Sequence, residues 1–145
     1  MSTATSTRAG ATSETVTWTY DEGTFGIGHL TRMGDPAGQT RYAYERRGLL
    51  REEVRSFPNL PHEYTTKYGY NRDGNRKSIA YPSTLLTVTY TSDHAGRPTA
   101  ASGIIAAAEY LPFGPLTRLQ FANGMTQKFE FDARYRRGVR TLRQR

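Results

Sequence analysis

The sequence predicts an all-β protein, an antiparallel meander of stacked β-hairpins that forms a curved sheet, and three observations support this. Aromatic and β-prone residues alternate with polar residues at a period of two, as in strands rather than helices. Most aromatic segments run into an acidic or amide residue with glycine three positions later, a combination typical of turns. This phrase recurs along the chain, and its equivalent positions are Asp21, Glu45, Asn71, Asp93 and Asp132.

The spacing between these equivalent positions is 24, 26, 22 and 39 residues, so the last interval is about two units long. A period in this range indicates a repeat protein, in which each unit cannot bury its apolar face alone. The composition agrees, because the hydrophobic fraction of the 145 residues is 36%, the mean hydropathy is -0.70 and ten residues are tyrosine. A thin apolar supply of this kind suits a sheet better than a thick core.

The first strand is expected to begin near Thr15. Residues 1–14 are rich in Ser, Thr, Ala and Gly without periodicity, which predicts a disordered lead-in, and residues 15–145 form the repeat sheet of about five to six repeats. The strands that lead into the turns carry their aromatic residues on one parity. These residues are Val16, Trp18 and Tyr20, then Tyr42 and Tyr44, then Tyr64, Tyr68 and Tyr70, then Val88 and Tyr90, and finally Phe129 and Phe131.

A returning strand follows each of these turns, which makes each unit a hairpin. The predicted returning strands are residues 30–33, 49–54, 76–81 and 98–101. Turns of a second kind, marked by proline or glycine, close the far end of each unit. They are predicted at residues 34–38, 57–59, 81–83, 112–115 and 122–124, and the whole is a meander of roughly ten strands.

The segment Ser102–Leu111 leaves two structures open. Its run of Ile, Ala and Glu contains good helix formers, but the segment is short and Pro112 ends it. The favoured interpretation is a further strand pair interrupted by small residues, and the alternative is a helical turn.

The end of the chain carries most of the net charge of +7. Residues 1–133 hold 14 Lys and Arg against 13 Asp and Glu, whereas residues 134–145 hold six arginines and no acid. These candidate polyanion contacts are Arg134, Arg136, Arg137, Arg140, Arg143 and Arg145. Such a cluster attracts a phosphate backbone or an acidic lipid surface without reading sequence. We favour the other interpretation, a basic last hairpin with Tyr135, Val139 and Leu142 on one face and solvated arginines on the other.

Several of these segments resemble a known family. Residues 74–82 with 88–98 look like two consecutive repeats joined, and residues 110–116 with 121–124 are similar to a segment common among Rhs chains. The chain thus resembles, over residues 15–142, the YD-repeat or Rhs-repeat proteins, which include the Rhs polymorphic toxins, the C component of insecticidal toxin complexes and the YD shell of teneurins. It departs from the pattern at Glu45 and Asn71, which replace aspartate, at Ser92, which replaces the second tyrosine, and at Tyr135, which replaces glycine.

The resemblance implies a long β-sheet that spirals into a hollow shell, in several members around a toxic C-terminal domain. The structural repeat positions that it and the internal periodicity indicate are Tyr20, Asp21, Tyr42, Tyr44, Gly48, Tyr68, Tyr70, Gly74, Tyr90, Asp93, Gly96, Phe131 and Asp132. A complete shell needs many more units, so we interpret the chain as a short fragment or a truncated member. It also implies a secreted or cell-surface location, although no secretory signal is visible at the N-terminus.

Two sets of these positions allow a functional interpretation as well as a structural one. Exposed tyrosines stack on sugar rings in glycan-binding sites, but their regular phase favours pairing across strands and with the next unit. The three aspartates are candidate acids or cation ligands, but each follows a strand, where a carboxylate caps free N–H groups of a turn. We favour the structural role in both cases.

The sequence therefore predicts a non-catalytic segment of an Rhs/YD-repeat shell that encapsulates or displays a toxin or effector domain. The alternative is a cell-surface carbohydrate-binding or adhesion module that uses the exposed sheet face. The chain has no cysteine, no metal-ligand spacing and no apolar run near the ~18 residues of a membrane span, so we expect no cofactor and no membrane span. The expected partners are neighbouring repeats or further copies at the bare sheet edges, an enclosed toxin domain and, in the alternative interpretation, a glycan, with nucleic acid disfavoured.

Overall fold

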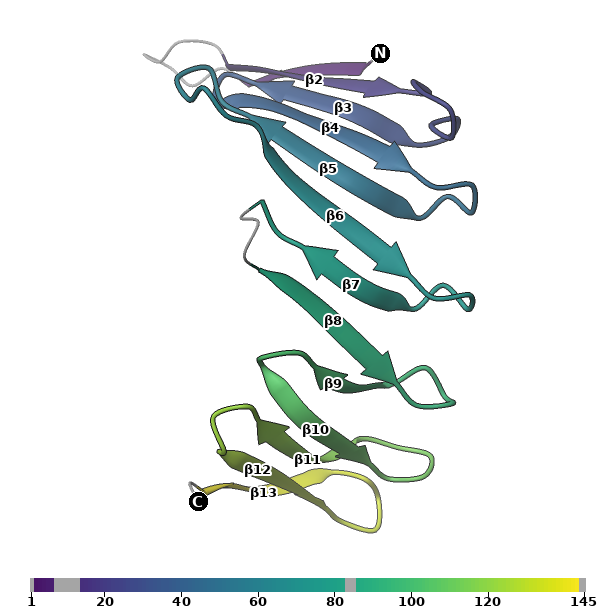
Figure 1. Ribbon diagram of the computed structural model, residues 1–145, viewed down its shortest axis with the longest axis vertical. Coiled ribbons are helices and arrows are strands. Elements are labelled where there is room, and N and C mark those ends of the chain that lie inside the picture. The colour runs from purple at the N-terminus through teal and green to yellow at the C-terminus, as the bar shows by residue number, and fades with distance from the viewer. Residues whose placement is uncertain (1, 7–13, 83–85, 144–145) are drawn as a thin grey trace. The chain divides into compact units, whose positions relative to one another are not determined.

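The computed structural model describes residues 2–6, 14–82 and 86–143, and within these ranges every regular element is a β-strand (Figure 1). The strands are β1 Ser2–Ser6, β2 Glu14–Tyr20, β3 Leu30–Asp35, β4 Gly38–Tyr44, β5 Leu50–Ser56, β6 Tyr64–Tyr70, β7 Arg76–Ala80, β8 Thr87–Ser92, β9 Pro98–Ala101, β10 Ile105–Tyr110, β11 Leu116–Phe121, β12 Thr126–Phe131 and β13 Arg137–Arg143. The predicted all-β class is confirmed, with thirteen described strands where the sequence predicted about ten.

The chain divides into two compact units, Met1–Gly74 with Ile79–Thr87, and Asn75–Ser78 with Val88–Arg145. In the first unit β1 to β6 pair in sequence order, and every pair is antiparallel. In the second unit β8 to β13 do the same. Each unit is therefore an antiparallel meander, as predicted, while β7 has residues in both units and β8 has its first residue, Thr87, in the first.

The start of the chain differs from the predicted lead-in. Ser2–Ser6 form β1, which pairs with β2 from Ser2 opposite Trp18 to Ser6 opposite Glu14. A Ser/Thr run has no apolar alternation to mark it as a strand, but Thr fits a pleated edge once a neighbouring strand offers its free N–H and C=O groups. The remainder of the predicted lead-in, residues 1 and 7–13, lies outside the described residues.

The segment Ser102–Leu111 contains a turn and one strand, so the helical alternative is wrong, and the strand interpretation holds for a single strand. Ile104 N–H donates to the carbonyl of Ala101 over 3.0 Å, and Gly103 has a φ of +72°. Strand β10 then runs from Ile105 to Tyr110 and pairs with β11. Alanines of good helix propensity are thus held in a ladder by their neighbours, because tertiary pairing overrides local preference.

This turn also moves Pro112–Pro115 to the other end of the sheet. The sequence placed these residues at the far end of a unit, but β10 returns the chain to the end where the turn after Asp93 lies. The 39-residue interval therefore holds one additional hairpin, whose turn begins at Leu111 instead of an acid.

Few side chains are fully buried. Among the described residues the buried apolar side chains are Ile79, Val88 and Ala101, and the buried polar ones are Thr31, Thr40 and Gln127. Most strand positions of both parities are half-buried or exposed. A sheet normally buries one face against a second layer, and the described residues supply no such layer. What holds consecutive hairpins together must therefore be sought in the strand ladders and at the turns.

Candidate functional site

Five described turns share one pair of backbone hydrogen bonds. The N–H of the first turn residue donates to the carbonyl four residues later, and the N–H three residues later donates back to the first carbonyl, over 2.8–3.2 Å. The first residues of these turns are Glu45, Asp93, Leu111, Phe121 and Asp132. The turn at Asn71 has the second of these bonds, from Gly74, over 3.2 Å. The turn geometry therefore does not depend on an acid at the first position.

The third residue after the turn start takes the left-handed backbone in three of the repeat turns that begin with a polar residue. The φ values are +75° at Gly48, +78° at Gly96 and +83° at Gly74. In the last such turn, Tyr135 takes the same region with a φ of +57°. Glycine adopts this backbone conformation without steric cost, whereas a residue with a Cβ adopts it only at a cost in energy. Tyr135 lies in the turn, which corrects its predicted place on a strand face, and the side chains of Val139 and Leu142 lie outside the described residues.

The aspartates predicted to cap turns accept backbone N–H groups. Asp93 Oδ1 accepts from Ala95 and Arg97, both over 2.9 Å. Asp132 Oδ1 accepts from the equivalent residues of its own turn, Arg134 and Arg136, over 2.8 and 2.9 Å. In each turn the N–H of the arginine is the main cause that lowers the pKa of the carboxyl group.

Asp21 caps a longer turn, where its Oδ1 accepts from the N–H of Gly28 over 2.6 Å. Asp21 itself has a φ of +68°. These three carboxylates are thus committed to separate turns and do not converge on one site.

An arginine in each of two turns reaches the next turn at the same end of its sheet, and we call this contact the arginine joint. Arg97 Nε donates to Asp93 Oδ2 over 2.7 Å, while its Nη1 donates to the carbonyl of Leu111, the first residue of the next turn, over 2.9 Å. The guanidinium also lies over the ring of Tyr110, 4.7 Å from its centroid. A carboxylate that fixes the guanidinium reduces the entropy lost when the second hydrogen bond forms.

The first unit has the same contact with a different spacing. Arg47 Nε donates to Glu45 Oε1 over 2.7 Å, and its Nη1 donates to the carbonyls of Asn71 and Arg72, both over 2.9 Å. Asn71 is the first residue of the next turn, so the acceptor is equivalent to Leu111. Glu45 and Asn71 depart from the repeat pattern, yet both take part in an arginine joint.

A tyrosine just before a turn makes a second recurring contact, which we call the tyrosine joint. Its hydroxyl donates to the carbonyl of the first residue in the strand that returns from the preceding turn. Tyr44 donates to Leu30 over 2.7 Å, Tyr70 to Leu50 over 2.8 Å and Tyr110 to Pro98 over 2.6 Å. Burial, with a smaller effect of Tyr42, raises the pKa of Tyr44, so this hydroxyl keeps its proton and acts as a donor.

The other predicted repeat tyrosines have different roles. Tyr68 donates to Glu53 Oε2 over 3.2 Å, and Tyr42 lies opposite the same Glu53 in the β4–β5 ladder. Tyr90 lies opposite Ala101 in the β8–β9 ladder. Tyr20 is 44% exposed, and Phe131 has no hydroxyl. Sequence reasoning missed both kinds of joint, although the recurrence of arginine four residues after Asp93 and Asp132 was a readable signal for one of them.

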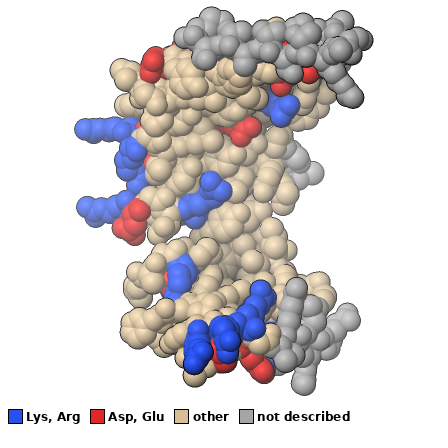
Figure 2. All heavy atoms as spheres, turned by 180° about the vertical axis from the view of Figure 1, so that it is seen from behind, with Lys and Arg blue, Asp and Glu red and all other residues tan. Residues whose placement is uncertain are grey.

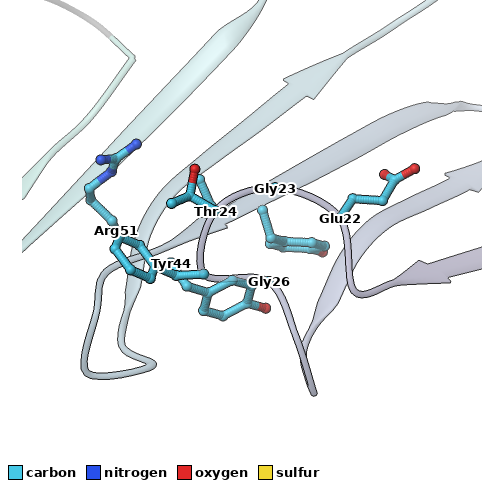
Figure 3. A pocket seen from close by; sticks show the side chains of 9 residues that line it. Glu22, Gly23, Thr24, Gly26, Tyr44 and Arg51 are labelled. Carbon is cyan, nitrogen blue, oxygen red and sulfur yellow. The ribbon is translucent and has the colours of Figure 1, made fainter.

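One cavity of the first unit lies next to a tyrosine joint. It has a volume of about 180 Å³ and is lined by the loop Glu22–Gly26 and by residues that include Tyr42, Tyr44 and Arg51 (Figure 3). The carboxylate of Glu22 is paired with Arg32 over 2.9 Å. Ligand pockets are commonly ~300 Å³ or more, so this cavity is small, and it brings together no nucleophile and base.

The predicted polyanion contacts are partly committed within the protein. Arg136 is paired with Asp132 over 2.7 Å, and Arg137 lies over the ring of Phe129, 4.4 Å from its centroid. Arg134 is exposed, and the side chains of Arg140, Arg143 and Arg145 lie outside the described residues. Over the face shown in Figure 2, acidic and basic side chains are interspersed.

The part of the chain that the structure describes offers neither a metal site nor a membrane-spanning helix. No set of three or more His, Cys, Asp or Glu side chains in these ranges is placed to hold a metal ion. Within the same ranges, no helix has the length and apolarity needed to cross a membrane.

No family model and no curated protein matches the sequence. Solved structures do match, among them chains in crystal structures of TcdB2-TccC3, TcdB2-TccC3-TEV and TcdB2-TccC3-Cdc42. Each is 16% identical, the TM-scores are 0.76, 0.74 and 0.74, and the matches cover 92%, 92% and 91% of this chain. The chain spans about 8% of the length of the chains that it matches. It therefore has the fold of the matched segment of TcdB2-TccC3, which supports the resemblance to YD-repeat proteins seen in the sequence.

Proposed function

We propose that this chain is a non-catalytic wall segment of an Rhs/YD-repeat shell, and that the complete shell encloses or displays a toxin or effector domain. Two findings support the proposal: the fold that it shares with TcdB2-TccC3, and the recurring joints between consecutive turns. A secreted or cell-surface location is part of the proposal.

The observation that carries most weight is where the stabilising contacts lie. Fully buried apolar side chains are few among the described residues, whereas the joints recur from hairpin to hairpin. A wall needs rigidity along the stack of hairpins, and both joints supply it by connecting one hairpin to the next. A compact binding domain would instead concentrate its contacts in one core.

The alternative, a glycan-binding or adhesion module, requires tyrosines that are free to contact a ligand. The hydroxyls of Tyr44, Tyr70 and Tyr110 are engaged by backbone carbonyls instead. A catalytic role requires converging groups, and the three aspartates cap separate turns. Both facts favour the wall.

A graft tests the proposal. Residues 14–143 replace the matched segment of a TcdB2-TccC3 shell, and the rate at which trypsin digests the enclosed domain is compared with the rate in the parent shell and with the free domain. We expect protection within about twofold of the parent. A soluble, assembled graft whose enclosed domain is digested as fast as the free domain would contradict the proposal.

A matched control shows whether protection depends on the joints or only on a segment of the right length. The same graft with Tyr70→Phe and Tyr110→Phe keeps the strands and removes two tyrosine joints, so protection should weaken while assembly persists. A glycan array probed with the isolated chain tests the alternative, and strong retention abolished by Tyr42→Ala would favour it.

A further inference from the structure

Two neighbouring turns of the second unit carry exposed aromatic side chains, and we call Phe113 and Tyr135 the aromatic tips. Phe113 lies in the turn that follows β10 and is 98% exposed, and Tyr135 lies in the turn that follows β12 and is 63% exposed. Both turns lie at the same end of their meander, on the right of the second unit in Figure 1. Exposed apolar residues that stand alone are common on protein surfaces, whereas those that form a common patch mark interaction sites.

The ring of Tyr135 leans towards the turn that holds Phe113. A Cβ added at Gly114 would lie 3.6 Å from Cε1 and 3.7 Å from Cδ1 of Tyr135, so the ring adjoins the residue that follows Phe113. Tyr135 also keeps a φ of +57° at a position where three other repeat turns have glycine. A residue held in an unfavourable backbone conformation is evidence for a functional constraint, here on the aromatic ring.

Phe113 is held out from the sheet by a tight turn. Gly114 N–H donates to the carbonyl of Leu111 over 3.2 Å, and Leu111 N–H donates to the carbonyl of Pro115 over 3.1 Å. Two prolines, Pro112 and Pro115, further restrict the backbone of this turn. Because the turn is already ordered, contact with a partner costs Phe113 little backbone entropy.

The turns at this end of the unit carry an excess of positive charge. Residues 93–97, 111–115 and 132–136 hold three arginines and two aspartates. Both aspartates are paired with arginines of their own turns. The excess charge therefore belongs to Arg134, which is exposed and makes no side-chain hydrogen bond or ion pair within the described residues. The paired side chain of Arg136 is itself 73% exposed, so it remains open to a further acceptor.

A lipid bilayer is the partner that this surface fits. Exposed turn tips cannot enclose a ligand, so they must enter their partner instead. The bilayer interface accepts aromatic rings, with tyrosine favoured at the level of the headgroups and phenylalanine at the boundary with the acyl chains. Arginine lays its stem along an apolar layer and keeps its charge among anionic headgroups. A protein partner would need a cavity shaped for Phe113, whereas a bilayer deforms around it.

We propose that the aromatic tips attach the second unit to a membrane surface that contains anionic phospholipid. Phe113 enters the boundary between headgroups and acyl chains, and the ring of Tyr135 lies beside it among the headgroups. The guanidinium groups of Arg134 and Arg136 contact lipid phosphates. The attachment is peripheral, since only the turns enter the bilayer. The inference goes beyond the wall function and does not depend on it.

Sedimentation of the full chain with vesicles tests the attachment. Vesicles of phosphatidylcholine mixed with an equal part of phosphatidylserine are compared with vesicles of phosphatidylcholine alone, and the bound fraction is measured against lipid concentration. We expect the wild-type chain to bind the mixed vesicles more tightly. Phe113→Ser should weaken this binding by about tenfold, because it removes a phenylalanine side chain from the interface.

Ile104→Ser is the matched control. Ile104 is 50% exposed and follows β9, in a turn at the opposite end of the same unit, where the proposal places no lipid. Its replacement should leave binding unchanged. The urea midpoint of Phe113→Ser should equal that of the wild-type chain, which shows that weaker binding does not come from unfolding.

A fluorescent reporter locates the point of entry. Phe113→Trp places an indole at an aromatic tip, and Ile104→Trp places one at the opposite end of the unit. Both variants keep Trp18, so its emission is a common background. Mixed vesicles with brominated acyl chains should quench Phe113→Trp more strongly than Ile104→Trp. Tyr135→Trp should bind like the wild-type chain, because both residues favour the interface, whereas Tyr135→Ala should bind more weakly.

Four outcomes would overturn the inference. They are failure of the wild-type chain to bind the mixed vesicles, equal losses from Phe113→Ser and Ile104→Ser, equal quenching of the two reporters, and loss of binding from Arg134→Ser with none from Phe113→Ser. The last would show that charge alone attracts the chain. Growth of the wild-type chain, but not of Phe113→Ser, in light scattering without vesicles would show that the tips bind a second copy instead. The grafted shell reports on the wall separately.

Discussion

The turns that begin at Asp93 and Asp132 share their first and last residues but differ at the left-handed position and in what lies beside them. Both have the same capping carboxylate, the same arginine pair and the same backbone hydrogen bonds. The first has glycine at the left-handed position and a further turn beside it, whereas the last has Tyr135 and none among the described residues. The comparison teaches that the carboxylate cap and the arginine pair persist where glycine is replaced, so glycine lowers the cost of this turn but is not required for it.

The largest effect is expected from breaking the first turn at its glycine. Gly96→Val forces a β-branched residue to a φ of +78°, and its Cβ would lie 2.8 Å from Asn75 Nδ2. We expect a loss of roughly 2–3 kcal/mol of unfolding free energy, measured by urea denaturation of the full chain.

Gly103→Val is the matched control for this loss. Gly103 has a φ of +72°, and a Cβ added there would meet no atom within 4 Å, so the substitution carries the backbone cost without the contact. If Gly103→Val destabilised the chain as much as Gly96→Val, the tight fit against Asn75 would have no role in this turn.

A smaller loss is expected from removing the tyrosine joint beside the first turn. Tyr110→Phe deletes the hydroxyl that donates to Pro98 over 2.6 Å and leaves that carbonyl without its partner. The expected cost is about 1 kcal/mol of unfolding free energy. Phe131→Tyr is the reverse change, because it adds a hydroxyl at the position from which a tyrosine joint would reach the carbonyl of Leu116. Urea midpoints of the two variants should move in opposite directions, and a shift in the same direction would refute the joint.

A gain is expected when the last turn is made more like the first. Tyr135→Gly removes the cost of a φ of +57° at a residue that is 63% exposed and therefore loses little packing. We expect a stabilisation of about 0.5–1 kcal/mol, read from the thermal unfolding midpoint. Tyr135→Ala keeps a Cβ at the same φ and should give no comparable gain, so an equal gain would show that the tyrosine ring, not the backbone, is unfavourable.

The smallest change in stability is expected from lowering the pH, because the carboxylates of Asp93 and Asp132 are both solvent-accessible. The N–H of Arg97 is the main cause of the lowered pKa of Asp93. A carboxyl group with a lowered folded-state pKa contributes stability that is complete above the unfolded-state pKa of about 4 and is lost as pH falls through the lower folded value. The urea midpoint of the wild-type chain should thus fall below about pH 4 more steeply than that of Asp93→Asn. Identical pH profiles would mean that the cap contributes nothing.

Much of the fold could be predicted from the sequence, because strand alternation and turn chemistry are local. Tyr42, Tyr68 and Tyr90 marked their strands correctly, and Pro98–Ala101 was predicted with the bounds that the structure has. The hairpin that turns at Leu111 was misplaced because leucine carries no carboxylate to mark a turn, although its backbone makes the same hydrogen bonds. Strand β1 was missed since its structure comes from the β2 ladder and not from its own pattern.

The joints were harder to predict than the turns. Arg97 reaches a residue 14 positions away, whereas Arg47 reaches residues 24 and 25 positions away. The contact depends on which turns lie side by side, and that depends on the number of strands between them. Where a hairpin has no acidic residue to mark its turn, as at Leu111, the number of strands cannot be predicted from the sequence. The donors of the joints can then be predicted, but their acceptors cannot.

Every joint has a main-chain carbonyl oxygen as its acceptor, so the hydrogen bond does not depend on the side chain of the accepting residue. The accepting carbonyls belong to residues as different as Leu111, Pro98 and Asn71. A polypeptide assembled in this manner can change freely on the receiving side of each contact, provided that the donors stay. Engineers who wish to lengthen or shuffle such a stack need to keep, in each hairpin, the tyrosine and the arginine with the carboxylate that orients it.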